Sequence, residues 1–322
     1  MGDTPAELHI VGIGNAIVDV LCHGTDELIA RHGLPKGSMT LIDAERAEAL
    51  HAATSPAVEI SGGSSANTMV AAASFGSPVA YIGKVRDDPY GHTFTHGIRA
   101  AGVRFDTPHA TTGAATARCY VMVSPEGERT MSTYLGACVD LGPEDVDESL
   151  IACSQVTYLE GYLWDRPRAK AALLAASAAA HTADRTVALT LSDTFCVERH
   201  RQDLLSLVRE EVDVLFANED EIRALYQTDA LPEALDRAQR DCVVSAITRS
   251  RHGSVVVSQN GIQAVPAEPV RNVVDTTGAG DCYAAGFLHG FATGQDLRTC
   301  ARLGSVAAAE IITHLGARPR QN

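Results

Sequence analysis

The sequence predicts an α/β protein in which a central, mostly parallel sheet carries helices on both faces. One indication is a series of short apolar runs, such as Val156 to Leu159 and Val187 to Leu191, each followed by a segment long enough for a crossover helix. These runs are nearly continuous in apolar residues, which is typical of strands buried on both faces. The strands expected earlier in the chain do not all fit into that sheet, so they predict a small separate β layer.

The N-terminal quarter of the chain begins with a buried strand, predicted from Leu8 to Val20. Short, half-exposed strands follow at Ser38 to Ile42 and at Val58 to Ile60. Next comes a helical pattern from Ser64 to Phe75, and then the run Val79 to Val85, which is apolar enough for a central strand.

A second helix is predicted from Pro89 to Ala101, before a hairpin. Residues 117–124 and 128–134 alternate in polarity around Pro125-Glu126-Gly127, which favours two antiparallel strands joined by a turn. The early strands, near 16–60 and 105–137, are expected to form a small β lid. Because no shift in composition marks a linker, residues 1–322 are predicted to be one domain with a lid that is discontinuous in sequence.

The second half of the chain alternates between strands and helices. The predicted strands are Val156–Leu159, Val187–Leu191, Val212–Phe216 and Val243–Thr248. An Asn260-Gly261 turn then joins Ser254–Ser258 to Ile262–Val265 in a hairpin. Two helices, about Gly280–Ala292 and Asp296–Thr313, complete the pattern.

Composition excludes several classes of protein. With 45% hydrophobic and 20% charged residues, the chain can bury a core and is not globally disordered. The net charge of −14 argues against a nucleic-acid partner. The most apolar stretch, Ala171 to Ala180, is too short to cross a membrane. Eight scattered cysteines without a Cys-x-x-Cys pair favour reduced thiols, so a cytoplasmic protein is expected.

The strongest local motif is Asp275-Thr276-Thr277-Gly278-Ala279-Gly280-Asp281, directly before the last-but-one predicted helix. A flexible Gly278-Ala279-Gly280 turn at a helix start lets free backbone N–H groups converge on one anion. Asp281, in the first helical turn, is then placed to accept a proton from a hydroxyl that approaches the same phosphoryl group. Ordinary helix capping explains such an aspartate about as well.

A second motif, Gly62-Gly63 with Asn67 one turn into the next helix, suits close approach of a ligand. Asn67 offers both a donor and an acceptor to a diol, although a plain strand-to-helix turn is an equally good explanation. Asp19 is a lone carboxylate in an apolar strand, so it needs a polar partner, and a sugar hydroxyl would serve.

Together these motifs resemble the ribokinase-like (phosphofructokinase-B type) carbohydrate and nucleoside kinases, from Ile10 to about Arg318. The resemblance implies a parallel sheet with a β lid and ATP with Mg²⁺ as the phosphoryl donor. It also leaves open a requirement for a monovalent cation such as K⁺. Asp281 would be the general base, Gly278, Ala279 and Gly280 would form the anion hole, and Thr277 would contact the nucleotide. The acceptor would be held by Asn15, Asp19, Gly62, Gly63 and Asn67.

Two further segments match the family pattern. Asn218 and Glu221 follow an apolar strand and correspond to the Asn-x-x-Glu motif, which would hold Mg²⁺ largely through water. A charged first helical turn is the alternative explanation. Thr248 and Gly253 match a nucleotide-binding segment, but Ser250 replaces its middle glycine, so nucleotide contacts there are less secure.

Within the family, the adenosine-kinase branch is the most similar. The segments Gly127–Thr130, Leu135–Ala137, Tyr158–Tyr162 and Leu191–Phe195 carry this likeness. It implies that Arg129 reaches the transferred phosphate, where a planar cation with five donors suits it; a solvated hairpin arginine is the alternative. Leu135 and Tyr162, with Leu41, Leu163 and Trp164, could form an apolar slot for a purine, or could simply be core residues.

The expected reaction is therefore ATP-dependent phosphorylation of the 5′-hydroxyl of a purine nucleoside, with adenosine giving AMP. A sugar kinase acting on ribose, fructose or a related sugar shares every catalytic motif and is the main alternative. A non-catalytic nucleoside- or sugar-binding protein is a third possibility, which the intact Asp281 turn argues against. His92 and His96 have metal-like spacing, but the sequence shows no third ligand nearby, so no metal is assigned to them.

Overall fold

The first two strands belong to different sheets. The computed structural model, which describes residues 7–23, 25–54, 58–124 and 129–320, places β1 (Leu8–Ile13) in a nine-stranded sheet and β2 (Ile17–His23) in a five-stranded one. The single strand predicted from Leu8 to Val20 is therefore wrong. The chain leaves the large sheet at Gly14, where a Cβ atom would lie 2.3 Å from Glu160 Oε2, so the close approach to that carboxylate requires glycine.

The nine-stranded sheet, called the large sheet below, confirms the α/β prediction. Its order is β14-β13-β12-β11-β10-β9-β1-β5-β6, parallel from β12 to β6 and antiparallel at the β12–β13–β14 end. Besides β1, it contains β5 (Val79–Ile82), β6 (Val103–Phe105), β9 (Ser154–Glu160), β10 (Thr186–Thr190), β11 (Val214–Asn218), β12 (Val244–Thr248), β13 (Ser254–Ser258) and β14 (Gly261–Val265). The sequence analysis missed β6, which is only three residues long and has little pattern to detect.

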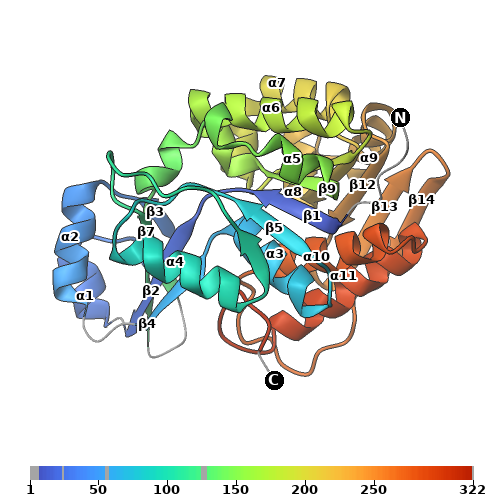
Figure 1. Ribbon diagram of the computed structural model, residues 1–322. Coiled ribbons are helices and arrows are strands. Elements are labelled where there is room, and N and C mark those ends of the chain that lie inside the picture. The colour runs from blue at the N-terminus through green and yellow to red at the C-terminus, as the bar shows by residue number, and fades with distance from the viewer. Residues whose placement is uncertain (1–6, 24, 55–57, 125–128, 321–322) are drawn as a thin grey trace.

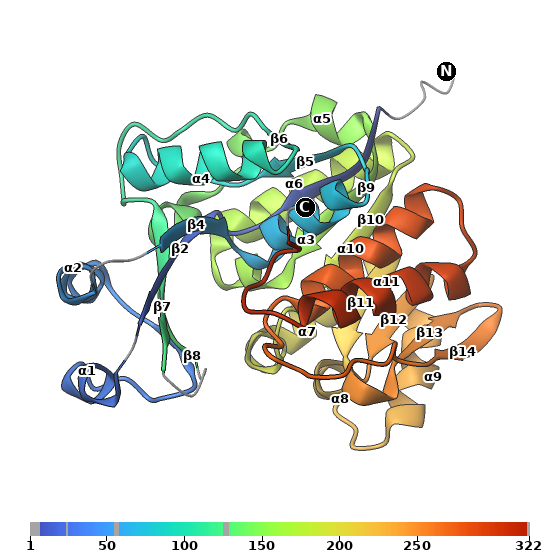
Figure 2. The same ribbon diagram turned by 90° about the horizontal axis from the view of Figure 1, so that it is seen from below.

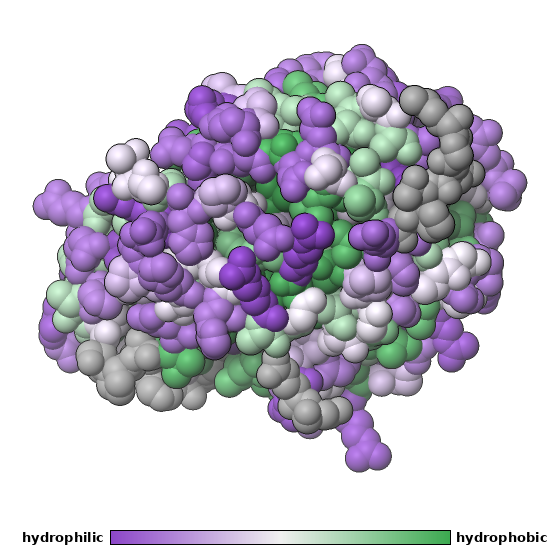
Figure 3. Space-filling model, viewed as in Figure 1, coloured by the Kyte–Doolittle hydropathy of each residue, from purple (hydrophilic) through white to green (hydrophobic). Residues whose placement is uncertain are grey.

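Helices cover both faces of the large sheet, as Figure 1 shows with α6 and α7 above it and α10 and α11 below. One layer holds α3 (Ser64–Ser74), α4 (Pro89–Ala100), α10 (Ala279–Ala292) and α11 (Leu297–Ile311); the other holds α5 (Glu148–Ala152), α6 (Pro167–Thr182), α7 (Thr194–Glu210), α8 (Glu219–Tyr226) and α9 (Leu231–Asp241). Neighbouring residues of β1 point alternately into the two cores, since Ile10 packs in one while Val11 and Ile13 pack in the other. On the face that Figure 3 shows, hydrophilic side chains cover much of the surface, and hydrophobic side chains gather near its centre.

The five-stranded sheet, called the small sheet below, has the order β3-β8-β7-β2-β4. Its other strands are β3 (Met39–Leu41), β4 (Val58–Gly62), β7 (Ala117–Val123) and β8 (Arg129–Tyr134). β7 and β8 pair antiparallel as the hairpin pattern predicts, although the turn Pro125-Glu126-Gly127 lies outside the described residues. Two helices that were not predicted, α1 (Asp26–Arg31) and α2 (Ala44–Ala53), accompany this sheet at one end of the molecule (Figure 2).

The carboxyl ends of the parallel strands bring polar residues together. Glu160 at the end of β9 pairs in register with Thr190 at the end of β10, and Asn218 of β11 pairs with Thr248 of β12. In open α/β sheets ligands bind at this edge. Among the described residues, no helix is both long enough and apolar enough to cross a membrane.

Candidate active site

A cavity of about 330 Å³ lies at the carboxyl edge of the large sheet. Its walls come from strand ends, from the start of α10 and from the 3₁₀ turn Gly161–Asp165 that follows β9. The lining residues are Ser64, Tyr162, Thr190, Ser192, Phe216, Ala217, Asn218, Glu221, Ala246, Thr248, Thr276, Gly278, Ala279, Gly280, Asp281 and Tyr283. The volume falls in the range of small-molecule sites, and several of the predicted site residues are gathered here.

The start of α10 forms one wall of this cavity. Gly278 precedes the helix with a φ of 77°, and a Cβ there would lie 2.8 Å from the Cα of Ala317, so glycine is needed for both conformation and space. A Cβ on Gly280 would meet no atom within 4 Å, so open space lies beside the first turn. The free N–H groups and positive end of a helix at such a place suit an anion.

Asp281 is half-buried in the first turn of α10. Its Oδ1 accepts a hydrogen bond of 2.6 Å from the Ser64 hydroxyl at the start of α3. Burial raises the pKa of Asp281 to about 6, although hydrogen bonds from Ser64 and Asn67 act in the opposite direction. A carboxylate with such a pKa is ionised near neutral pH and can still accept a proton.

Gly62 and Gly63 connect the small sheet to α3, and both are required by close contacts. A Cβ on Gly62 would lie 2.4 Å from Asp19 Oδ2, and one on Gly63, whose φ is 98°, would lie 2.2 Å from the Asn15 carbonyl oxygen. Gly62 thus lies against Asp19, and Gly63 lies against Asn15. Asn67 is one turn further on, where its N–H donates to the Gly63 carbonyl oxygen at 2.8 Å, so the five residues are neighbours. We call these five residues the acceptor side.

Glu160 is a buried carboxylate that the sequence analysis did not assign to the site. Its Oε1 accepts from Asn15 Nδ2 at 2.6 Å and its Oε2 accepts from the Ser65 N–H at 2.9 Å. Burial raises the pKa of Glu160 to about 7, against the effect of these hydrogen bonds. The only signal in the sequence is a charged residue directly after the apolar run Val156 to Leu159.

Asn218 and Glu221 face the cavity from the start of α8. They form a reciprocal cap in which Asn218 Nδ2 donates to Glu221 Oε1 at 2.6 Å and Asn218 N–H donates to Oε2 at 2.9 Å. Burial raises the pKa of Glu221 to about 7. Both carboxylate oxygens thus already hold a donor, so a magnesium ion bound through water fits this pair better than direct coordination.

Thr248 lines the cavity, whereas Gly253 and Thr277 are not among the residues that line it. Gly253 is in a turn with a φ of 80°, where a Cβ would lie 2.1 Å from the Val265 carbonyl oxygen, so the structure gives it a packing role. Thr277 turns toward Asp275, whose Oδ1 accepts from its N–H at 3.0 Å and from its hydroxyl at 2.7 Å.

Arg129 joins the small sheet to the loop before α10. Its Nη2 lies 2.8 Å from Asp275 Oδ2, and both side chains are nearly buried. The pKa of Asp275 is lowered, because hydrogen bonds from Gly316 and Thr277 and the charge of Arg129 together outweigh its burial. Arg129 is thus held beside the segment that leads into Asp281.

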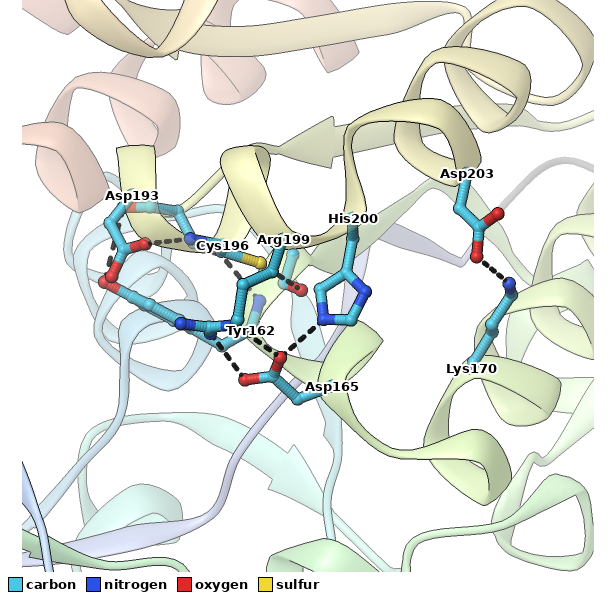
Figure 4. Close-up of polar contacts among 10 residues, drawn as sticks. Tyr162, Asp165, Lys170, Asp193, Cys196, Arg199, His200 and Asp203 are labelled. Atoms are coloured by element: carbon cyan, nitrogen blue, oxygen red, sulfur yellow. Dashed lines mark hydrogen bonds and ion pairs between the residues drawn. The ribbon is translucent and has the colours of Figure 1, made fainter. Parts of the chain in front are cut away.

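The aromatic residues past β9 have different surroundings. Tyr162 lines the cavity, and its hydroxyl donates to the Ser192 carbonyl oxygen at 3.3 Å. Figure 4 shows Tyr162 near Asp193 at the start of α7. In the same view, the Asp165 carboxylate binds the side chains of Arg199 and His200. Trp164 is buried in the core, so its suggested place at a purine is wrong.

The three leucines suggested for the purine slot have different surroundings. Leu163 is buried in the same core as Trp164, and Leu41 is 53% exposed at the edge of the small sheet. Leu135 is half-buried directly after β8.

His92 does have further possible ligands, contrary to the sequence analysis. Its donor atoms lie within 4.8 Å of those of Asp87 and His109, whereas His96 is not in this group. Asp87 and His92 are exposed, and an ordinary ion pair with 3.1 Å between Oδ1 and Nε2 accounts for their contact. We therefore assign no metal to this cluster.

Comparison with solved structures finds close relatives over nearly the whole chain. The adenosine kinase from Sinorhizobium meliloti is 50% identical with a TM-score of 0.90, and 98% of this chain and 96% of that chain are covered. A probable sugar kinase from Rhizobium etli CFN 42 is 46% identical with a TM-score of 0.91, with the same 98% and 96% coverage. One of these relatives is an adenosine kinase and the other is a probable sugar kinase, so the comparison supports both kinds of acceptor.

Sequence comparison points to the same group of enzymes. The adenosine kinase of Saccharomyces cerevisiae is 27% identical over 330 residues, with 95% of each chain covered. The model of the pfkB family carbohydrate kinases matches residues 36–321. This chain therefore belongs to the pfkB family and is an ATP-dependent phosphotransferase with an alcohol group as acceptor.

Proposed function

We propose that this protein phosphorylates the 5′-hydroxyl of a purine nucleoside, with conversion of adenosine to AMP as its main reaction. The observation that carries the proposal is the place of Asp281. Its carboxylate lines the cavity at the start of α10 and also bonds to Ser64 of α3, the helix that carries Asn67 on the acceptor side. One group thus faces both the anion site and the acceptor.

Asp281 acts as the general base in this proposal. Its raised pKa of about 6 makes it basic enough to take the proton of the attacking hydroxyl, while it stays ionised at neutral pH. The start of α10, with Gly278, Ala279 and Gly280, stabilises negative charge on the transferred phosphoryl group. These groups mainly position the reactants and stabilise charge, which is what phosphoryl transfer needs.

Arg129 adds a cation near the transferred group. In this structure it pairs with Asp275 at 2.8 Å, six residues before Asp281 in the chain. A rotation of the side chain toward the cavity would bring its planar guanidinium to the phosphate, whose oxygens it can bind with two parallel hydrogen bonds. Asp275 holds it close by until a phosphate competes for it.

The donor side of the cavity suits ATP with Mg²⁺. Asn218, Glu221 and Thr248 would hold the ion through water and contact the nucleotide, and the bound ion would neutralise charge on the phosphates. Gly253 and Thr277, which were also expected to contact the nucleotide, support the turns beside this site instead. K⁺ is to be tested as an additive.

The acceptor side suits the hydroxyls of a ribose. Asp19 and the Asn67 amide supply acceptors and a donor, and the absence of side chains at Gly62 and Gly63 leaves the backbone accessible. Free sugars offer the same hydroxyls, so these residues alone do not separate nucleosides from sugars. The 50% identity with an adenosine kinase supports the nucleoside.

A sugar kinase is the second candidate, and the 46% identity with a probable sugar kinase supports it. We do not pursue the third alternative, a non-catalytic binding protein, because the chain belongs to a kinase family and has the complete Gly278–Asp281 turn.

The test is a steady-state panel of adenosine, guanosine, inosine, ribose and fructose with ATP and Mg²⁺, with and without K⁺. We expect adenosine to have the highest kcat/KM, at least about tenfold above any free sugar, because stacking of a base on an aromatic ring contributes roughly 1–3 kcal/mol. A higher kcat/KM for ribose or fructose would assign the protein to the sugar kinases.

A further inference from the structure

The segment after α11 carries a charged residue into the acceptor side. The Gly316 N–H donates to Asp275 Oδ2 at 2.9 Å, and Ala317 packs directly against Gly278. Both contacts fix this segment to the loop before α10. The next residue, Arg318, then points to the opposite side, toward the junction of β4 and α3.

Arg318 makes two hydrogen bonds at that junction. Its Nε donates to Asn67 Oδ1 at 2.9 Å and its Nη1 donates to the Ser61 hydroxyl at 2.6 Å. Its Nη2 is buried and has no hydrogen-bond partner among the residues that the structure describes. A buried donor without a partner is costly, so this nitrogen is available for a bound ligand or a water molecule.

The bond from Arg318 sets the orientation of the Asn67 amide. Because Oδ1 accepts from an arginine, which has no acceptor of its own, the other end of the amide must be the NH₂ group. That NH₂ group is the only part of the side chain that can donate to the Asp281 carboxylate, whose pKa Asn67 lowers. Without Arg318, the amide could rotate and present its carbonyl oxygen to the carboxylate.

Arg318 also balances the charge of Asp19. Burial raises the pKa of Asp19 to about 6, and Arg318 and then Arg129 oppose this effect. Conversely, burial lowers the pKa of Arg318 to about 10, and Asp19 opposes that shift. Each group therefore makes the ionised form of the other more favourable.

We propose that Arg318 is a positioning residue of the acceptor side, which directs the NH₂ group of Asn67 toward Asp281 and supplies the positive charge that Asp19 needs. The proposal rests on the role of Asp281 as base in the proposed function. The other ionisable groups that face Asp281 are Tyr158 and Glu160 on β9, Tyr162 after it, and the neighbouring Cys282. Cys119 of β7 and Arg129 face Asp19. The variants below leave all of these unchanged.

The experiment compares Arg318→Met, Arg318→Gln and Arg318→Lys with Arg320→Met, a change of an exposed arginine in the same segment. For each, kcat and KM are measured from about pH 5 to pH 9 with the best acceptor of the wild-type panel. Loss of a hydrogen bond to a charged group costs roughly one pKa unit or more. We therefore expect Arg318→Met and Arg318→Gln to move the acid limb of kcat upward by about one pH unit.

The KM for the acceptor should rise about tenfold or more in the same two variants, because Asp19 loses its cation. In Arg318→Lys, the KM should return close to the wild-type value, because an ammonium keeps the positive charge. The acid limb of kcat should stay shifted, since a lysine lacks the planar guanidinium that bonds to Asn67 and Ser61 together. Ser64→Ala, which removes the other hydrogen bond to Asp281, should shift the acid limb in the same direction.

An acid limb that stays at the wild-type pH in Arg318→Met and Arg318→Gln would overturn the proposal, and so would a KM equal to that of Arg320→Met. A uniform loss of kcat with an unshifted limb and a lower Tm would mark Arg318 as a structural anchor only. Failure of the proposed nucleoside reaction can be distinguished from failure of this proposal, because the wild-type panel would then show a preference for a sugar. In that case the same pH profiles of the variants are measured with the sugar as acceptor.

Discussion

The central strands of the large sheet and the edge strands of the small sheet differ in how far they are buried. All four residues of β5 in the large sheet are buried, whereas three of the five residues of β4 in the small sheet are exposed. Two layers of helices cover the large sheet, but Leu41 and Val58 of the small sheet are 53% and 63% exposed. The edge strands of the small sheet thus have fewer packing contacts to lose if this sheet moves, and we expect them to contribute less to stability than the central strands of the large sheet.

The site is built where these two regions meet. Asp281 and the start of α10 belong to the helical layers of the large sheet, while Asp19, Gly62 and Arg129 belong to the small sheet or its junctions. In the proposed function, the large sheet carries the base and the anion site, and the small sheet carries the residues for the acceptor; closure of the small sheet over the site would then exclude water. The following predictions test this division, in order of decreasing expected effect.

Replacement of the base should affect activity most. Asp281→Asn keeps the size of the side chain but cannot take up the proton, so we expect kcat to fall by about two to four orders of magnitude. Calorimetric binding of the acceptor should change much less. Near-normal turnover in the folded variant would remove Asp281 from its role.

A matched pair of isoleucines compares the two sheets directly. Ile82 at the end of β5 is 1% exposed and Ile60 in β4 is 37% exposed. Ile82→Ala should lower the free energy of unfolding by roughly 2–5 kcal/mol, as is usual for a core residue, and Ile60→Ala by about 1 kcal/mol or less. Chemical denaturation measures both values. Equal losses would contradict the proposed difference in stability between the sheets.

The buried carboxylate of Asp281 should also lower the free energy of unfolding at high pH. Folding raises the pKa of Asp281 from 3.8 to about 6, so the native state binds more protons than the unfolded state between these values. The stability of the wild type therefore falls as pH rises through this window, by on the order of 1–3 kcal/mol from this group. Asp281→Asn lacks this penalty.

The stability gain of Asp281→Asn over the wild type should thus appear near pH 8 and shrink toward pH 4. Thermal unfolding at both pH values measures it, and the difference between the two proteins cancels the titration of Asp19 and Glu221, whose pKa values do not depend on Asp281. A variant that is less stable than the wild type at pH 8 would show that the ionised carboxylate stabilises the fold.

The smallest expected effect is in the motion of the small sheet. If the acceptor draws this sheet onto the site, amide exchange in β3 and β4 should slow by on the order of fivefold, or about 1 kcal/mol of local opening. Exchange in β9 and β10 of the large sheet should stay the same. Equal protection of both regions, or of neither, would argue against closure of the small sheet as a lid.

Local patterns in the sequence were sufficient for most of the large sheet and for the start of α10. The runs Val187–Leu191 and Val212–Phe216 are apolar except for Thr190 and Asp213, because both faces of these strands are covered, and β10 and β11 overlap them. The motif Gly278-Ala279-Gly280-Asp281 is likewise local, since a helix start needs only consecutive residues. Short elements with weak patterns, such as α1 and β6, were missed.

The contacts within the site were decided by the tertiary structure. Ser64 and Asp281 are 217 residues apart in the chain, and Asn67 and Arg318 are 251 residues apart, so no local pattern relates them. The break at Gly14 is of the same kind, because it depends on the carboxylate of Glu160, which a strand 146 residues away brings to this point. Periodicity reports which face of an element is buried, whereas the partner of a polar group depends on how distant elements pack. The sequence by itself thus determined most strands of the large sheet and the glycine turn before α10, because these depend on neighbouring residues, whereas packing decided which distant polar groups meet around Asn67 and Asp281.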